Sequence, residues 1–308
     1  MTPIPFTKAI SWDEYMAHRP PYPSSMWKLW LDYHRGPLEV AHDVGAGGGV
    51  AANDLANYSP LPIKRIYVSD PGQEHLAFAE KMLKQRHPQI EFVFNSTVAE
   101  TVWLEDGAVD FVCCCEALHW VDVSEGMPVM ARSLRSGGTF AAIYYLPYPK
   151  ITNSAAAQAA MMRLLDDFAK NTADAAVAGP AWRRGFSNSN IGMDFVPFDA
   201  ELWTDVRRME VNVDDEGWPS SKFMAERFGE ARNFAVEEGD GRKERWEDES
   251  WKKIETPEKL RQILMKFLGA TEEIWESQAW SEVLDAAEEV GGLLDLSFMV
   301  SMVLARKK

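Results

Sequence analysis

The chain has 308 residues, of which 46% are hydrophobic and 26% charged, and its formal net charge is −15. This size and composition suit a globular protein with one large domain, or one domain that carries a sizeable insertion. The negative charge opposes nucleic acids and anionic membrane surfaces, and no apolar run approaches the roughly 20 residues that cross a bilayer. The first residues lack the features of a secretory signal. We therefore expect a cytoplasmic protein that binds neither nucleic acid nor membranes.

The N-terminal region, residues 1–36, predicts a helical flap. An aromatic and Pro-rich stretch contains Tyr15, Arg19 and Tyr22, and residues 24–34 then place apolar side chains on one face of a helix. We expect the flap to act as a lid over a ligand. A segment that is simply docked on the surface is the alternative.

Residues 37–150 alternate short apolar runs with helical patterns, which implies a parallel sheet with right-handed crossovers. Strands are predicted at 39–44, 65–69, 91–94, 109–115 and 139–145, and helices at 50–58, 74–86 and 124–134. Residues 151–308 predict helical insertions that cover a substrate. They also predict two last strands, at about 202–213 and 294–305, both antiparallel to the others. The predicted fold is an α/β, Rossmann-like, doubly wound sheet of seven strands in mixed orientation, with helical lid insertions.

Three other features predict structure rather than function. The cysteines, Cys113–Cys115, are consecutive in a predicted strand, so neighbours point to opposite faces and predict neither a disulfide nor a metal site. The charged run at 237–249 favours a solvated loop or helix face. Trp275 and Trp280 favour core positions.

The sharpest motif is a glycine turn after the first predicted strand. The strand ends near Asp43, and Gly45, Ala46, Gly47 and Gly49 follow before the next helix. Glycines remove the Cβ where backbone must approach a ligand closely, and a helix N-terminus offers N–H groups to an anionic group. NAD and FAD sites use related geometry, so the turn alone leaves the ligand open.

An acidic residue ends the second predicted strand. Asp70 lies 27 residues beyond Asp43, where a carboxylate can accept the hydroxyls of a ribose. The alternative is a carboxylate that only caps the next helix. The turn reads Asp-x-Gly-x-Gly-x-Gly, which differs from the Gly-x-Gly-x-x-Gly of dinucleotide sites.

In order and spacing, the segments that follow resemble the class I S-adenosylmethionine-dependent methyltransferases. These segments are 96–100, 104–112, 116–120 and 134–140. Residues 15–23, 116–120 and 294–308 are also similar to the fungal trans-aconitate methyltransferase family. The chain departs from that family in two ways. It carries Ala46 and three glycines where the family usually has Cys-Gly-Pro-Gly, and it has a helical insertion after Pro257.

The resemblance implies S-adenosyl-L-methionine as the cofactor and S-adenosyl-L-homocysteine as the product. It implies that the glycine turn holds the methionyl part, Asp70 the ribose, and residues 98–99 the adenine. The cofactor-binding residues it implies are Asp43, Gly45, Ala46, Gly47, Asp70, Pro71, Val98, Ala99, Glu116 and Ala117.

Candidate catalytic residues are His119 and Trp120, which follow the fourth predicted strand, and Tyr15 of the flap. His119 could act as a base on an alcohol, whereas a carboxylate or phenolate acceptor needs none. A structural His–Trp pair is the alternative. Arg183, with Arg184, and Lys266 could bind a carboxylate, and surface cations without that role are the favoured alternative. The candidate substrate contacts are Arg19, Tyr22, Tyr144, Tyr145, Arg183 and Lys266.

These residues together predict methyl transfer to an oxygen of a small organic acid or secondary metabolite, by a monomer or a homodimer. Two alternatives remain open. One is a non-methylating rearrangement with the same cofactor, and the other is a non-enzymatic binding or regulatory protein. The form of the glycine turn makes a dinucleotide oxidoreductase the least favoured reading.

Overall fold

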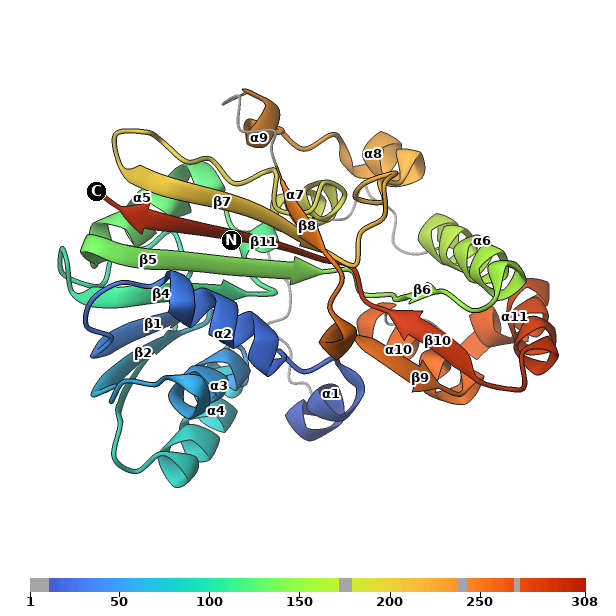
Figure 1. Cartoon of the computed structure of the whole chain (residues 1–308), viewed down its shortest axis with the longest axis horizontal. Coiled ribbons are helices and arrows are strands. Elements are labelled where there is room, and N and C mark those ends of the chain that lie inside the picture. The colour runs from blue at the N-terminus through green and yellow to red at the C-terminus, as the bar shows by residue number, and fades with distance from the viewer. Residues whose placement is uncertain (1–10, 172–178, 238–242, 269–271) are drawn as a thin grey trace.

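A central eight-stranded sheet organises the molecule (Figure 1). The computed structural model describes residues 11–171, 179–237, 243–268 and 272–308. The strand order is β3-β2-β1-β4-β5-β11-β7-β8. The strands are β1 Val40–Val44, β2 Arg65–Ser69, β3 Glu91–Asn95, β4 Val109–Cys115, β5 Leu134–Tyr145, β7 Trp203–Val211, β8 Glu244–Trp246 and β11 Val300–Lys307. The pairs from β3 to β5 are parallel, as the strand–helix alternation predicts.

Helices cover both faces of this sheet, which makes the fold doubly wound. On one face pack α2 Ser24–Tyr33, α3 Val50–Tyr58 and α4 Gln73–Arg86, and on the other packs α5 Val123–Ser133. Strand β4 serves both cores because its side chains alternate. Cys113 and Cys115 face the first core and Cys114 the second, and all three are buried free thiols. The interpretation of the cysteines as buried strand residues is confirmed.

The prediction of seven strands was wrong, and so was the orientation of one of the last two. The sheet gains β8, which pairs parallel with β7, and only β11 is antiparallel to its neighbours β5 and β7. The helical crossover after β5 returns the chain to the edge where β5 begins, so β7 runs in the direction of β5. Strand β11 starts from the opposite edge and must run the other way.

The predicted strand at 294–305 is two strands in two different sheets. The short strand β10 Leu294–Ser297 lies between β6 Lys150–Ile151 and β9 Lys252–Glu255 in a second, three-stranded sheet. The break falls at Phe298, whose side chain is fully buried and whose N–H donates to the carbonyl of Trp251. The chain therefore turns at Phe298 and passes from the three-stranded sheet into the central sheet.

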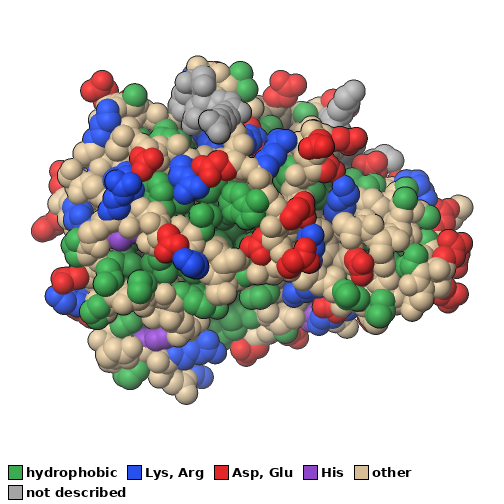
Figure 2. Space-filling model, viewed as in Figure 1, with side chains coloured by type: hydrophobic (Ala, Val, Ile, Leu, Met, Phe, Trp, Pro, Cys, Tyr) green, Lys and Arg blue, Asp and Glu red, His purple; other side chains and the backbone are tan. Residues whose placement is uncertain are grey.

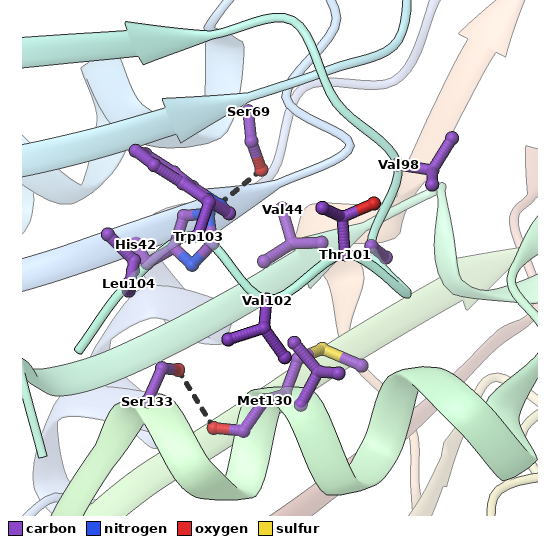
Figure 3. Close-up of a pocket in the computed structure, with 12 residues that line it drawn as sticks. His42, Val44, Ser69, Val98, Thr101, Val102, Trp103, Leu104, Met130 and Ser133 are labelled. Atoms are coloured by element: carbon purple, nitrogen blue, oxygen red, sulfur yellow. Dashed lines mark hydrogen bonds between the residues drawn. The ribbon is translucent and has the colours of Figure 1, made fainter. Parts of the chain in front are cut away.

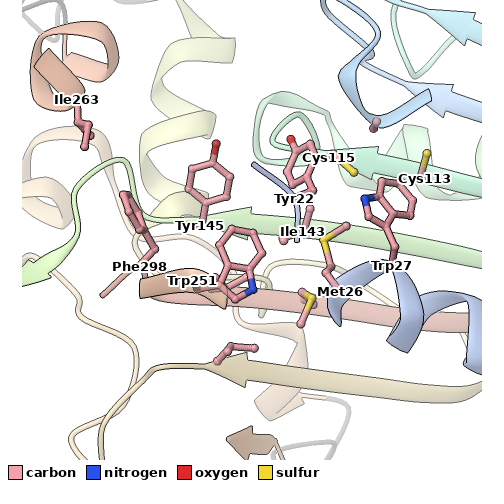
Figure 4. Close-up of a cluster of buried hydrophobic side chains, with 14 of the residues drawn as sticks. Tyr22, Met26, Trp27, Cys113, Cys115, Ile143, Tyr145, Trp251, Ile263 and Phe298 are labelled. Carbon is pink, nitrogen blue, oxygen red and sulfur yellow. The ribbon is translucent and has the colours of Figure 1, made fainter. Parts of the chain in front are cut away.

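Helices beside the small sheet form a cover next to the carboxyl ends of the parallel strands (Figure 1). They are α6 Ala155–Asn171, α10 Pro257–Leu268, η3 Glu272–Glu276 and α11 Gln278–Glu289. Trp275 and Trp280 are both buried with ring centroids 5.0 Å apart, which confirms their core positions. Figure 4 shows how Tyr145 of the sheet and Trp251 and Phe298 of the cover share one core.

The remaining elements are α1 Trp12–His18, η1 Leu118–Trp120, α7 Pro180–Ser189, α8 Lys222–Phe228, α9 Phe234–Glu237 and η2 Glu249–Trp251. Among the described residues, no helix is long and apolar enough to cross a membrane. On the face shown in Figure 2, acidic and basic side chains are interspersed.

The charged run at 237–249 is more structured than predicted, although residues 238–242 lie outside the described residues. It contains β8 and leads into the buried Trp251. The strand was not predicted, but Glu244, Arg245, Glu247 and Glu249 are exposed, as expected of a solvated segment. Glu210 of β7, which is fully buried, binds two cations of the run. The Nζ of Lys243 lies 2.6 Å from one carboxylate oxygen of Glu210, and the Nε of Arg245 lies 2.7 Å from the other.

We expect Glu210→Ala to lower the free energy of unfolding by about 2 to 3 kcal/mol, because it removes the fully buried carboxylate that Lys243 and Arg245 share and leaves Lys243 with Asp194 alone. Urea unfolding followed by circular dichroism measures this change. The matched control is Glu244→Gln, which weakens a more exposed pair with Arg207 and should cost less than about 0.5 kcal/mol. Equal losses in the two variants would contradict the assignment.

Candidate cofactor and substrate site

The glycine turn lies between the end of β1 and the start of α3. Gly45, Gly47 and Gly49 all have positive φ angles, of 66°, 53° and 79°, which favour glycine over other residues. A Cβ on Gly45 would lie 2.4 Å from the Cβ of Ala117. The N–H of Ala46 donates to the carbonyl of Ser69 at the end of β2. The turn is thus fixed to both neighbouring strands.

Asp43 holds the helix that follows the turn. Its side chain is buried, and its Oδ2 accepts a hydrogen bond from the N–H of Ala52, 2.9 Å away. The Sγ of Cys113 lies 3.8 Å from its other oxygen. Burial raises the pKa of Asp43 to about 7, although these hydrogen bonds oppose the shift. Asp43 therefore lies beneath the turn, where it anchors α3.

Asp70 lies directly beside the turn. Its Oδ2 accepts from the N–H of Gly47 at 2.9 Å, and its Oδ1 accepts from the N–H of Gly72 at 2.7 Å. The contact with Gly72, at the start of α4, is the capping contact considered as the alternative. The contact with Gly47 brings Asp70 and the glycine turn together, as a shared cofactor site requires. Pro71 follows, and its carbonyl accepts from the hydroxyl of Ser96.

No motif in the sequence identified Trp12 as part of this site. Its indole lies against the turn, so that a Cβ on Gly47 would be 2.4 Å from the indole Cη2. The ring of His75 on α4 packs against the same indole, with centroids 5.2 Å apart. The only signal was an aromatic residue in a Pro-rich stretch, and such a pattern does not predict which residues the side chain contacts.

Val98 and Ala99, predicted near the adenine, line a pocket between the segment after β3 and α5 (Figure 3). The pocket also contains His42 of β1, which makes a 2.8 Å hydrogen bond to the hydroxyl of Ser69. Burial lowers the pKa of His42 to about 3, so its ring is neutral at pH 7. Val98 and Ala99 thus lie beside the ends of β1 and β2, on the same side of the sheet as α5.

Glu116 ends β4 with a φ of 54°, a left-handed conformation that is uncommon for a residue with a side chain. Its Oε1 accepts from the N–H of Tyr145 at 2.6 Å, and its Oε2 lies 3.6 Å from a guanidinium nitrogen of Arg19. Burial raises the pKa of Glu116 to about 8 against the opposing effect of Arg19. The carboxylate therefore joins the flap to the ends of two strands.

Arg19 lies among aromatic rings. Its guanidinium carbon is 4.3 Å from the ring centroid of Tyr15 and 5.3 Å from that of Tyr145. Tyr22 packs against Tyr145 at 6.3 Å. Burial raises the pKa of Tyr15 to about 12, so its phenol stays protonated at pH 7. The structure thus brings together the predicted residues of the flap and those at the ends of β4 and β5.

The rings of His119 and Trp120 pack against each other with centroids 4.6 Å apart, as in the structural pair considered as the alternative, and each ring makes a further contact. His119 is buried, packs 4.8 Å from the ring of Tyr144, and has its pKa lowered to about 3 by burial. Its Nδ1 has no hydrogen-bond partner among the described residues. Trp120 packs instead on α7, where a Cβ on Gly185 would lie 2.1 Å from the indole. The contacts of Trp120 are those of a packing residue.

The cations predicted on the substrate side are not gathered in one place. Arg183 is exposed on α7, whereas the adjacent Arg184 donates to the carbonyl of Trp120 from two nitrogens, at 3.1 and 2.9 Å. Lys266 falls within α10, but its side chain lies outside the described residues. Arg19 is therefore the candidate cation that the structure places beside Glu116.

Residues 42–142 match the family model of a methyltransferase domain. The chain is 30% identical over 215 residues to the methyltransferase pgmE of Aspergillus terreus, a match that covers 65% of this chain and 62% of that protein. It is 28% identical over 236 residues to the methyltransferase ptaI of Pestalotiopsis fici, which covers 68% of this chain and 67% of that one. The chain thus spans about three fifths of the length of pgmE.

A solved structure from Anaeromyxobacter dehalogenans, described as a candidate type II methyltransferase, superimposes with a TM-score of 0.59 at 17% identity. That match covers 94% of this chain and 97% of the other. The fold is accordingly the Rossmann-like fold of class I methyltransferases, with eight strands. Neither fungal relative is described as a trans-aconitate methyltransferase, so that narrower resemblance stays a prediction.

The matched domain and the fold imply S-adenosylmethionine as the cofactor. The residues present fit this group. The glycines at 45 and 47 have positive φ angles and leave the turn without Cβ atoms where backbone can approach a ligand, and a buried carboxylate directly follows β2. Glu116 and Ala117 lie at the end of β4, on the side of an open α/β sheet where ligands bind.

We expect Glu116 to make stability fall as pH rises from about 4.5 to 8. The folded protein retains a proton on Glu116 in this window, since burial raises its pKa from 4.5 to about 8, whereas the unfolded chain has lost it. The contribution is fully present below pH 4.5 and is lost above pH 8. Glu116→Gln removes this titration and leaves the raised carboxyls of Asp43 and Asp54 in place.

Urea unfolding of both proteins at several pH values tests this expectation. The wild-type free energy of unfolding should fall relative to that of Glu116→Gln, with a slope of up to about 1.4 kcal/mol per pH unit. A difference that stays constant from pH 4.5 to 8 would show that Glu116 is ionised throughout.

Proposed function

We propose that the protein is an S-adenosylmethionine-dependent methyltransferase that acts on an oxygen of a small organic acid or secondary metabolite. The observation that carries the proposal is the contact between the glycine turn and Asp70, inside the region that matches a methyltransferase domain. The fungal relatives described as methyltransferases support the same activity. Because the match covers only 62% of pgmE, we propose the substrate from the site itself and not from that relative.

The bound cofactor would supply an activated sulfonium methyl group. The work of the chain is then to hold an acceptor oxygen in line with that group and to exclude water, an effect worth several kcal/mol in oriented reactions. Tyr144 and Tyr145 at the end of β5 are buried, and His119 packs against Tyr144. Tyr144 and His119 lie on the α5 side of the sheet, whereas Tyr145 packs in the core on the opposite side, and its N–H binds Glu116.

The substrate class follows from Arg19. Its guanidinium is stacked on Tyr15 and its side chain is only 17% exposed, so it is pre-organised to bind a carboxylate or phenolate. Such acceptors are already deprotonated and need no base. Burial lowers the pKa of His119 to about 3, which makes it a weak base and favours a role as a neutral hydrogen-bonding partner.

Asp70→Ala should abolish cofactor binding, because it removes the acceptor that adjoins both the glycine turn and the start of α4. Calorimetric titration with S-adenosylmethionine and S-adenosylhomocysteine measures this. Wild type should bind with a micromolar dissociation constant. The control is Asp106→Ala, an exposed carboxylate paired with Arg132 and remote from the turn, which should bind like wild type. No binding by folded wild type would overturn the proposed function.

Arg19→Gln should raise the KM for an acidic acceptor by about tenfold or more, because a charged hydrogen bond contributes roughly 1.5 to 3 kcal/mol. A screen of carboxylic acids and phenols, followed by steady-state kinetics with the best acceptor, measures the change. Arg132→Gln, on the exposed face of α5, is the control. An equal loss in the affinity of a neutral ester of the same acid, measured as an inhibitor of the reaction, would argue that Arg19 orders the flap and does not bind the negative charge.

A further inference from the structure

Trp12 covers the surface of the glycine turn that a ligand would use. A Cβ on Gly47 would lie 2.4 Å from the Cη2 of its indole, and one on Gly48 would lie 2.5 Å from its Cδ2. For these two glycines, the nearest atoms outside the turn belong to this one side chain. The indole is only 9% exposed, so it fills the surface rather than bordering it.

The surroundings of the indole come from the other parts of the same site. Its ring packs against His75 at 5.2 Å and Phe78 at 6.3 Å, both on α4, which begins just after Asp70. Both carboxylate oxygens of Asp70 are bound to backbone N–H groups, those of Gly47 and Gly72. The N–H of Gly47 and both carboxylate oxygens of Asp70 therefore have hydrogen-bond partners within the chain.

The helix that carries Trp12 is short and is held by few side-chain contacts beyond the indole itself. Helix α1 has seven residues, too few for much stability of its own. It is held by side-chain contacts: Arg19, just beyond its end, pairs with Glu116 at 3.6 Å, and His18 lies 3.2 Å from the Nζ of Lys259 on α10. These contacts link the glycine turn, the end of β4 and the helical cover through one short segment.

We propose that the indole of Trp12 and the cofactor compete for the same surface of the glycine turn, so that α1 leaves this position when the cofactor binds. The inference rests on the proposed function, since it requires the cofactor to bind at this turn. A protein that is closed most of the time binds its ligand more weakly, by the fraction of molecules that are open. Arg19 follows α1 directly, so the movement that admits the cofactor also releases the cation from Glu116.

Binding of S-adenosylhomocysteine to wild type, Trp12→Ala and Trp12→Phe tests the proposal by calorimetry and by stopped-flow association rates. Removal of the indole should tighten binding by about fivefold or more and raise the association rate, with the phenylalanine variant between. Trp246→Ala, in β8 and away from the turn, is the matched control and should bind like wild type. Cooperative thermal unfolding of each variant verifies that it is folded.

A second measurement follows Trp12 directly. In protein labelled with 5-fluorotryptophan, the ¹⁹F resonance that disappears in Trp12→Phe belongs to Trp12, and it should shift when S-adenosylhomocysteine saturates the wild type. Weaker or unchanged binding by Trp12→Ala, or a Trp12 resonance that does not shift, overturns the proposal while the cofactor site stands. Binding by Trp12→Ala alone supports it, and no binding by either protein overturns the proposed function together with it.

Discussion

The site depends on a close approach between the ends of two neighbouring strands. At the carboxyl edge of the sheet, Gly45 lies so near Ala117 that a Cβ there would come within 2.4 Å. Below it, the buried carboxylate of Asp43 binds the backbone of α3 and contacts Cys113 of β4. A buried carboxylate is tolerated only when such bonds satisfy it. This arrangement fixes the direction of the turn, and with it the position of Asp70.

The second constraint is the way the cover joins the core. Tyr145 ends β5 and packs against Trp251 and Phe298, which come from the last quarter of the sequence. The N–H of Tyr145 also binds Glu116, which in turn pairs with Arg19 of the flap. Sheet, flap and cover therefore meet around one tyrosine. These contacts adjoin the end of β4, where we propose that the chemistry takes place.

The strands and helices of the core could be predicted because their signals are local. The segments 50–58, 65–69 and 109–115 have the predicted bounds, since each combines a clear periodicity with glycine, proline or charged residues at its ends. The direction of β7 is a property of topology, which periodicity does not report. Strand β8 has three residues inside a charged run, and its partner Glu210 lies more than thirty positions earlier. Trp251 directly follows the same run, and no local pattern marked it as a core residue.

The residues of the candidate site also divide into those with a local sequence signal and those without one. The glycines, Asp70 and Glu116 were found because motif order identifies residues at strand ends, where the fold itself brings them together. The contacts of Trp12, Arg19 and Trp120 depend on how the flap and α7 dock, and the amino-acid types alone allow many arrangements. Trp120 packs on α7 only because Gly185 leaves room for its indole. A glycine outside any motif thus decides whether a tryptophan next to the site faces the ligand or the scaffold.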